Sequence, residues 1–151
     1  MSLDAATKRT LAAVLDRIVP PGEDGRLPGA GELGLADFVE ENLRARPELR
    51  PVLEEGLARL DEEARARAGR PFAALEPPAQ REALDAAAAA LPAFFGPLLF
   101  QTYVGYYRHP QVLEALGLEP RPPYPLGFQV PATDFRLLEP VRRRKPLYRV
   151  P

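Results

Sequence analysis

Proline placement constrains this chain more than any other feature of its sequence. Nineteen prolines occur among 151 residues, and they are densest in residues 118–151. Helix interiors and central strands exclude proline, because its ring fixes φ and removes an amide donor. The same segment carries regularly spaced apolar side chains, which a disordered tail would lack. We therefore predict a helical bundle domain in residues 1–117 and, in residues 118–151, an extended arm that packs on the bundle or on a partner.

The sequence before residue 118 reads as helices separated by proline and glycine. Apolar residues recur at helical spacing from Leu11 to Ile18, and Pro20-Pro21 ends that helix. The same reasoning predicts helices over residues 35–46 and 49–68, a fourth from Pro77 to about residue 91, a fifth after Pro92 and a short sixth that ends at Gly117. Strand-like alternation is absent from this part of the sequence. The predicted fold is an all-α, single-domain bundle of five to six helices.

The fifth predicted helix has apolar or aromatic side chains on every face, which is typical of a fully buried helix. We therefore expect it to form the buried centre of the bundle, and we expect Leu99→Ala to cost about 2–5 kcal/mol of stability. Its apolar residues are Phe94, Phe95, Leu98, Leu99, Phe100, Tyr103, Val104, Tyr106 and Tyr107.

Composition excludes several classes of chemistry. The chain has no cysteine, which rules out disulfides, thiolate metal sites and cysteine nucleophiles. Its net charge of −1 gives no overall attraction to nucleic acid, so we expect no nucleic-acid partner. His109 is the only histidine and Ser2 the only serine, so a Ser-His-Asp constellation is implausible, and His109 before Pro110 is expected at a helix N-cap boundary. We predict no catalytic residue, no cofactor site and no metal site.

Two motifs that resemble functional sites favour structural roles. Residues 29–34 match GxGxxG, but a dinucleotide site needs a preceding strand, and here a helix end and prolines precede the motif. We interpret it as a glycine-rich loop that enters a helix. The acidic groups at residues 40–41, 54–55 and 61–63 have arginines nearby, and we interpret them as solvated, ion-paired helix faces.

Two segments of the sequence bear on export and membrane insertion. The N-terminal residues lack the apolar core of a signal peptide, so a cytoplasmic location is expected, and a periplasmic one only if a partner carries the chain across. Residues 86–107 contain no charge, but they are rich in alanine and broken by Pro92, Gly96 and Pro97. We expect a soluble chain without direct membrane insertion.

The arm supplies the candidate partner-binding residues. Aromatic side chains would act as apolar anchors, and a short basic run would form salt bridges with a partner or with the acidic body. These residues are Tyr124, Phe128, Phe135, Arg142, Arg143, Arg144 and Tyr148.

Four stretches, in this order, resemble the gluconate 2-dehydrogenase subunit 3 family. They are LAAVLDRIVPPGEDGRLPGAGELGLADFVE (residues 11–40), GRPFAALEPPAQREAL (69–84), FFGPLLFQTYVGYYRHPQVLEALG (94–117) and PPYPLGFQVPATDFRLLEPVRRRKPLYR (122–149). The resemblance implies a small, non-catalytic accessory subunit of a bacterial, membrane-associated, flavin-dependent sugar or alcohol dehydrogenase. The flavin would then lie in a large flavoprotein subunit, which is the expected partner.

Two other functions remain open at this stage. The aromatic residues of the fifth predicted helix could line a pocket, which would make the chain a stand-alone helical binding module for a small apolar ligand. An enzyme that uses His109 with a nearby carboxylate is the other alternative.

Overall fold

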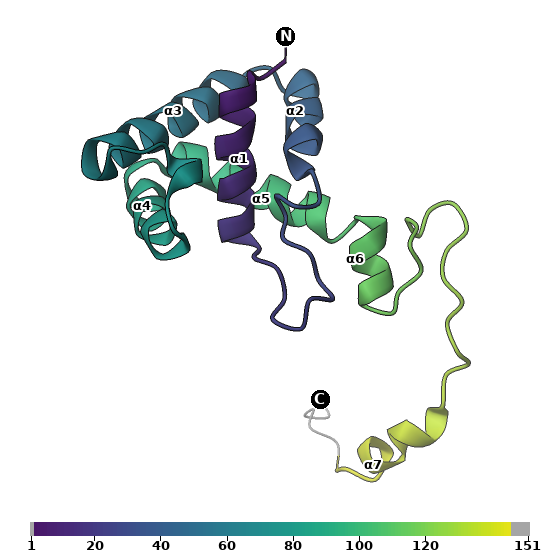
Figure 1. Cartoon of the computed structure of the whole chain (residues 1–151). Helices are drawn as coiled ribbons and strands as arrows, with labels where there is room; N and C mark the ends of the chain where they lie inside the picture. Colours follow the sequence, from purple (N-terminus) through teal and green to yellow (C-terminus); the bar gives the residue numbers. More distant parts are fainter. Residues whose placement is uncertain (1, 146–151) are drawn as a thin grey trace, which may run out of the picture. The chain divides into compact units, whose positions relative to one another are not determined.

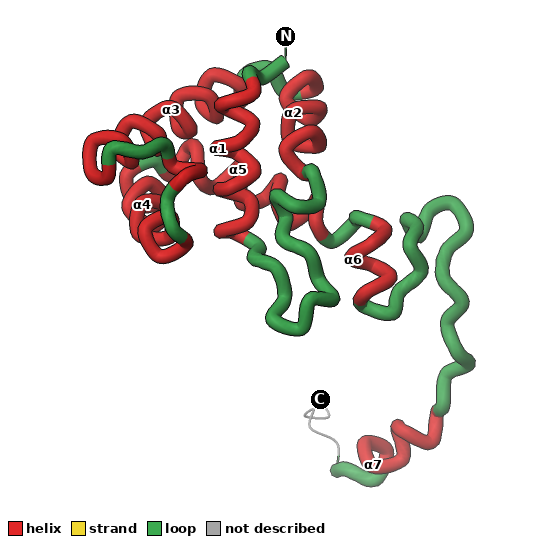
Figure 2. The backbone as a smooth tube through the Cα atoms, viewed as in Figure 1, coloured by secondary structure: helices red, strands yellow, loops and turns green. Residues whose placement is uncertain are grey.

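The computed structural model describes residues 2–145 and divides the chain into two compact units, residues 1–121 and 122–151. Helices and loops account for the described residues, and no strand occurs among them (Figure 2). The all-α prediction is therefore confirmed.

The first unit contains the helices that the proline and glycine pattern predicts. Pro77, Pro92 and Pro110 each stand at the first position of a helix, where the missing amide hydrogen has no intrahelical partner to lose. At the other end, Gly69 closes the longest helix in a left-handed conformation with φ 67°. The elements are α1 (Ala5–Ile18), α2 (Leu35–Ala45), α3 (Leu49–Ala68), the 3₁₀ turn η1 (Phe72–Ala74), α4 (Pro77–Ala90), α5 (Pro92–Tyr106) and α6 (Pro110–Ala115).

Helix α1 is the centre of this unit. It packs against α2, α3, α4, α5 and η1, and Figure 1 shows it between α2 on one side and α3 and α4 on the other. Its side chains Leu11, Val14 and Leu15 are fully buried. Asp4 caps its N-terminus by accepting hydrogen bonds from the amides of Ala6 (2.8 Å) and Thr7 (3.0 Å).

The expectation that the fifth helix is the buried centre is wrong. One face of α5 packs on the bundle through Phe94, Leu98 and Tyr106, but the opposite face is exposed and Leu99 is only half-buried. An apolar sequence on all sides of a helix indicates that every face is compatible with burial. It does not indicate that the same chain supplies a neighbour for each face. In the first unit, one face of α5 stays exposed.

A loop of residues 19–34 joins α1 to α2 and lies against both α1 and α5. The amide of Ala30 donates to the carbonyl of Val19 (3.0 Å), which closes the base of the loop. The hydroxyl of Tyr106 on α5 donates to the carbonyl of Pro28 (2.9 Å), and burial raises the pKa of that tyrosine. The loop is therefore held at several points along its length.

The second unit contains the 3₁₀ turn η2 (Phe135–Leu138) and the short helix α7 (Glu139–Arg142), within its described residues 122–145. The prediction of a wholly extended arm is wrong here. Proline is absent between Ala132 and Glu139, and Pro140 falls in the first turn of α7, where it is tolerated. Asp134 starts this segment by accepting a hydrogen bond from the amide of Arg136 (3.0 Å).

Candidate functional site

The arm presents its apolar side chains to solvent. Tyr124, Phe128 and Phe135 are all exposed, as are Leu137 and Val141 in the helical part. The three aromatic side chains that the sequence predicts as anchors therefore lie on the surface of the described part of the arm. Tyr148, the remaining predicted anchor, lies outside the described residues.

The basic run of the arm has few acidic neighbours. Glu139 lies 3.4 Å from Arg142 and 4.0 Å from Arg143, so one carboxylate faces two guanidinium groups. Arg144 is exposed. Upstream, Arg136 forms a close pair with Asp134 (2.9 Å) and lowers the pKa of that carboxyl. Positive charge therefore accumulates at the C-terminal end of α7.

A second exposed apolar surface lies on α5 and was not predicted from the sequence. Four residues spaced at i, i+3, i+4 and i+7 line the exposed side of this helix and its C-cap. They are Phe100 (61% exposed), Tyr103 (44%), Val104 (38%) and Tyr107 (56%), here called the α5 stripe. The rings of Tyr103 and Tyr107 are 6.2 Å apart, so the stripe is a continuous aromatic surface at its C-terminal end. The sequence signal for it is the absence of charge over residues 86–107.

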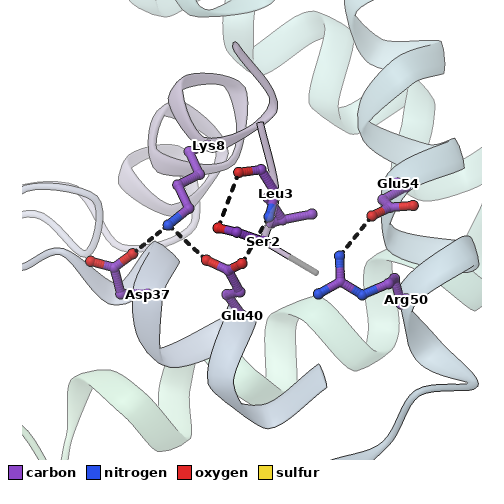
Figure 3. Close-up of polar contacts among 7 residues, drawn as sticks. All are labelled: Ser2, Leu3, Lys8, Asp37, Glu40, Arg50 and Glu54. Atoms are coloured by element: carbon purple, nitrogen blue, oxygen red, sulfur yellow. Dashed lines mark hydrogen bonds and ion pairs between the residues drawn. The ribbon is translucent and has the colours of Figure 1, made fainter. Parts of the chain in front are cut away.

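A buried carboxylate joins the N-terminal segment to α2 (Figure 3). Glu40 accepts hydrogen bonds from the amide of Leu3 (2.7 Å) and from the ammonium of Lys8 (2.6 Å), which also contacts Asp37 (2.9 Å). Lys8, and then Ser2 and the Leu3 amide, lower the pKa of Glu40 to about 2. Glu40 is therefore not part of a solvated acidic face, as the sequence had suggested, but a structural anion.

Asp61 on α3 has a similar structural role. Its Oδ1 accepts hydrogen bonds from the Thr10 hydroxyl on α1 (3.1 Å) and from the amide of Phe72 in η1 (3.0 Å), while Arg65 lies 3.2 Å from its other oxygen. The interpretation as a solvated face is therefore wrong for Asp61 as well. It is right for Glu54, Glu55 and Glu63, which form exposed i,i+4 pairs with arginines.

The GxGxxG motif closes the loop onto α1. The amides of Gly31 (2.6 Å) and Glu32 (3.2 Å) donate to the carboxylate of Asp16, whose pKa is raised by burial. A Cβ at Gly31 would collide with the carbonyl oxygen of Ala12 and lie 2.6 Å from Asp16, so only glycine allows this approach. Gly34 has φ 72° and directs the chain into α2. Local geometry thus explains Gly31 and Gly34.

His109 occupies the N-cap position of α6, as the sequence suggested. Its Nδ1 atom is buried and has no hydrogen-bond partner, so no carboxylate orients the ring from that side. Within residues 2–145, no group of three or more histidine or acidic residues is arranged to hold a metal ion. The arrangement expected of an acid–base pair at His109 is therefore not found in the described chain.

An apolar cavity lies between α2, α3 and α5. Its lining includes Val39, Leu53, Phe94 and Leu98, and its volume is about 30 Å³. A ligand pocket usually encloses roughly 300–1,000 Å³, whereas a space of this size holds about one water. Tyr106 is one of the aromatic residues that could have lined a ligand pocket. Its hydroxyl instead donates to the carbonyl of Pro28.

No single helix among the described residues has both the length and the apolar character needed to cross a membrane. The pair α4 and α5 meets those two criteria only when taken together, with a bend of 118° between them.

The fold and these surfaces define the chain as a small all-α bundle with a proline-rich arm. A sequence model of the family described as gluconate 2-dehydrogenase subunit 3 matches residues 5–120, and the chain belongs to this family. The match covers α1 to α6 and stops before the second unit, so it does not include the resembling stretch at residues 122–149. Searches of curated proteins and of solved structures found no match.

Proposed function

We propose that this chain is a non-catalytic accessory subunit that binds the large flavoprotein subunit of a dehydrogenase. The observation that carries the proposal is the family match over residues 5–120, because the family is described as a dehydrogenase subunit. The geometry of the first unit supports it. Glu40, Asp61 and the GxGxxG glycines, which are the features most suggestive of chemistry, all serve to hold the bundle together.

The arm is the first docking element of this proposal. Tyr124, Phe128 and Phe135 would fill apolar pockets on the partner, with Arg142, Arg143 and Arg144 pairing with its carboxylates. Exposed aromatic and arginine side chains are the residue types that contribute most to protein interfaces. Prolines restrict the arm before binding, so it loses less conformational entropy when it becomes ordered on a partner.

The experiment is affinity capture of the tagged chain produced together with the flavoprotein subunit. Wild type is expected to give a stoichiometric complex whose eluate shows flavin absorbance. Deletion of residues 134–151 is expected to weaken binding at least tenfold. A colourless monomer from wild type would contradict the proposed function.

A charge-matched pair of variants isolates the contribution of the basic run. The triple variant Arg142→Ala/Arg143→Ala/Arg144→Ala is expected to slow association and to lower affinity, with a loss that shrinks at high salt. The control removes three exposed arginines from α3, namely Arg59, Arg65 and Arg67. Equal losses in both triple variants would show that net charge, and not the arm, is recognised.

A further inference from the structure

The α5 stripe is an apolar surface that the fold of residues 1–121 does not cover. A helix with 3.6 residues per turn places residues i, i+3, i+4 and i+7 on one side, and this is the spacing with which a helix anchors into a groove. On α5 the opposite side already packs on the bundle. The chain thus has one helix with two apolar faces, of which one is occupied.

The size of the stripe bears on what could cover it. From the exposed fractions of its four side chains and roughly 150–250 Å² for a large aromatic side chain, it exposes on the order of 400 Å² of apolar surface. That lies within the range of the largest apolar patch on a typical monomer, about 300–600 Å², and patches of this size are often functional. It is about half of the roughly 800 Å² that each partner buries in a specific interface, which suits the apolar core of such an interface with a polar rim around it.

A second copy of the chain fits this area less well. Two stripes packed on each other would bury about 800 Å² in total, which is the size of a crystal-packing contact. A larger partner with a concave surface can enclose both the stripe and the residues around it.

A lipid surface also fits less well. Helices that lie on membranes combine an apolar face with a lysine- or arginine-rich polar face. Helix α5 contains no charged residue, and Arg108, the first basic residue after it, has its guanidinium over the ring of Phe38 on α2 at 5.6 Å. The aromatic content of the stripe instead matches the residue types enriched at protein interfaces.

We propose that the α5 stripe is a second docking site, which seats in an apolar, uncharged groove of the dehydrogenase flavoprotein subunit. This inference rests on the proposed function, because the partner is the same. It adds a contact on the helical bundle to the contact made by the arm. Two linked contacts raise affinity because the second forms within the encounter complex.

The first test measures affinity for the co-produced flavoprotein subunit with variants that replace exposed apolar side chains by glutamine inside or outside the stripe. Phe100→Gln/Tyr103→Gln is expected to raise Kd at least tenfold, since aromatic anchors at interface centres dominate binding. Leu116→Gln is the control, because Leu116 is 47% exposed, which is close to the exposure of the stripe residues, but lies outside both the stripe and the arm. It is expected to change Kd less than twofold. Thermal unfolding of the isolated variants confirms that each one is folded.

The second test replaces Tyr103 with a photo-crosslinking phenylalanine analogue in the full chain. Illumination is expected to link position 103, but not the same analogue at position 116, to the flavoprotein subunit. Wild-type binding together with an unchanged Kd for the double variant would overturn the α5 inference and leave the proposed function standing. A crosslink from position 103 to a second copy, to the chain itself or to lipid would also overturn it. If wild type captures no flavoprotein, both proposals fail.

Discussion

A comparison of Leu15→Ala with Leu99→Ala tests which helix is the centre of the bundle. Leu15 on α1 is fully buried, whereas Leu99 on α5 is half-buried and lines a surface recess with Arg17 and Arg81. Both substitutions remove the same atoms from helix interiors and leave a good helix former. We expect Leu15→Ala to be much more destabilising, because only that site is enclosed on all sides.

The magnitudes follow from burial. Removing the three outer carbons of the fully buried Leu15 loses about 2.4 kcal/mol, at roughly 0.8 kcal/mol per methylene. A residual cavity of about 50 Å³ adds roughly 1.2 kcal/mol, so the expected total is about 3.6 kcal/mol. At Leu99 about half of the transfer contribution applies and solvent can enter the vacated space, so we expect about 1 kcal/mol.

Urea unfolding followed by far-UV circular dichroism measures the difference. The two variants should share the wild-type slope of free energy against urea, so their midpoints report stability directly. A loss at Leu99 equal to or larger than the loss at Leu15 would refute the reasoning. It would mean that α5, and not α1, is enclosed in solution.

Three further predictions concern contacts within the first unit. Gly31→Ala should destabilise the protein by about 1–3 kcal/mol, because the added Cβ overpacks against α1. Gly96→Ala should stabilise it by about 0.5–1 kcal/mol, because the Cβ would meet open space and alanine is the better helix former. Chemical denaturation measures both changes. Asp61→Ala should cost about 1–3 kcal/mol and speed hydrogen exchange at the amide of Phe72, which loses its acceptor. The carboxyl of Glu40 has its pKa lowered from 4.5 to about 2 on folding, so the unfolded chain takes up the proton first as pH falls. The contribution of this carboxylate to the free energy of unfolding should therefore be fully present above pH 4.5 and decline between pH 4.5 and 2. Urea midpoints measured over this pH range should show that part of the decline in wild type but not in Glu40→Gln. Equal dependence of the midpoint on pH in the two proteins would contradict the assignment.

Helix positions were largely predictable because the sequence marks them locally. Pro77, Pro92 and Pro110 mark helix starts, and Pro20 lies just beyond the end of α1. Apolar spacing then assigned the buried faces of α1, α2 and α3. In the arm the density of proline concealed the short segment from Phe135 to Arg142, where the local sequence does allow helical turns.

The roles of Glu40 and Asp61 could not be read from the sequence. Their partners lie far along the chain, at Leu3 for Glu40 and at Thr10 and Phe72 for Asp61. A single charged residue on a helix has the same local pattern whether it faces solvent or a buried amide.

The exposed face of α5 shows a different limit. Hydrophobic periodicity reports which faces avoid water, and it cannot say whether the neighbour belongs to the same chain. The candidate residues Tyr124, Phe128, Phe135 and Arg142–Arg144 were proposed from composition, and their binding role stays a prediction.

The central position of α1 has a consequence for how the protein is made. Helix α1 is synthesised before the other helices, yet the side chains that enclose it come from α2, α3, η1, α4 and α5. Leu11, Val14 and Leu15 therefore stay without their full set of neighbours until the ribosome has released residue 106. A nascent chain with an uncovered apolar helix is prone to aggregation. Arrest of translation before α5 should thus leave a product that depends on chaperones, whereas arrest after α6 should leave one that folds by itself.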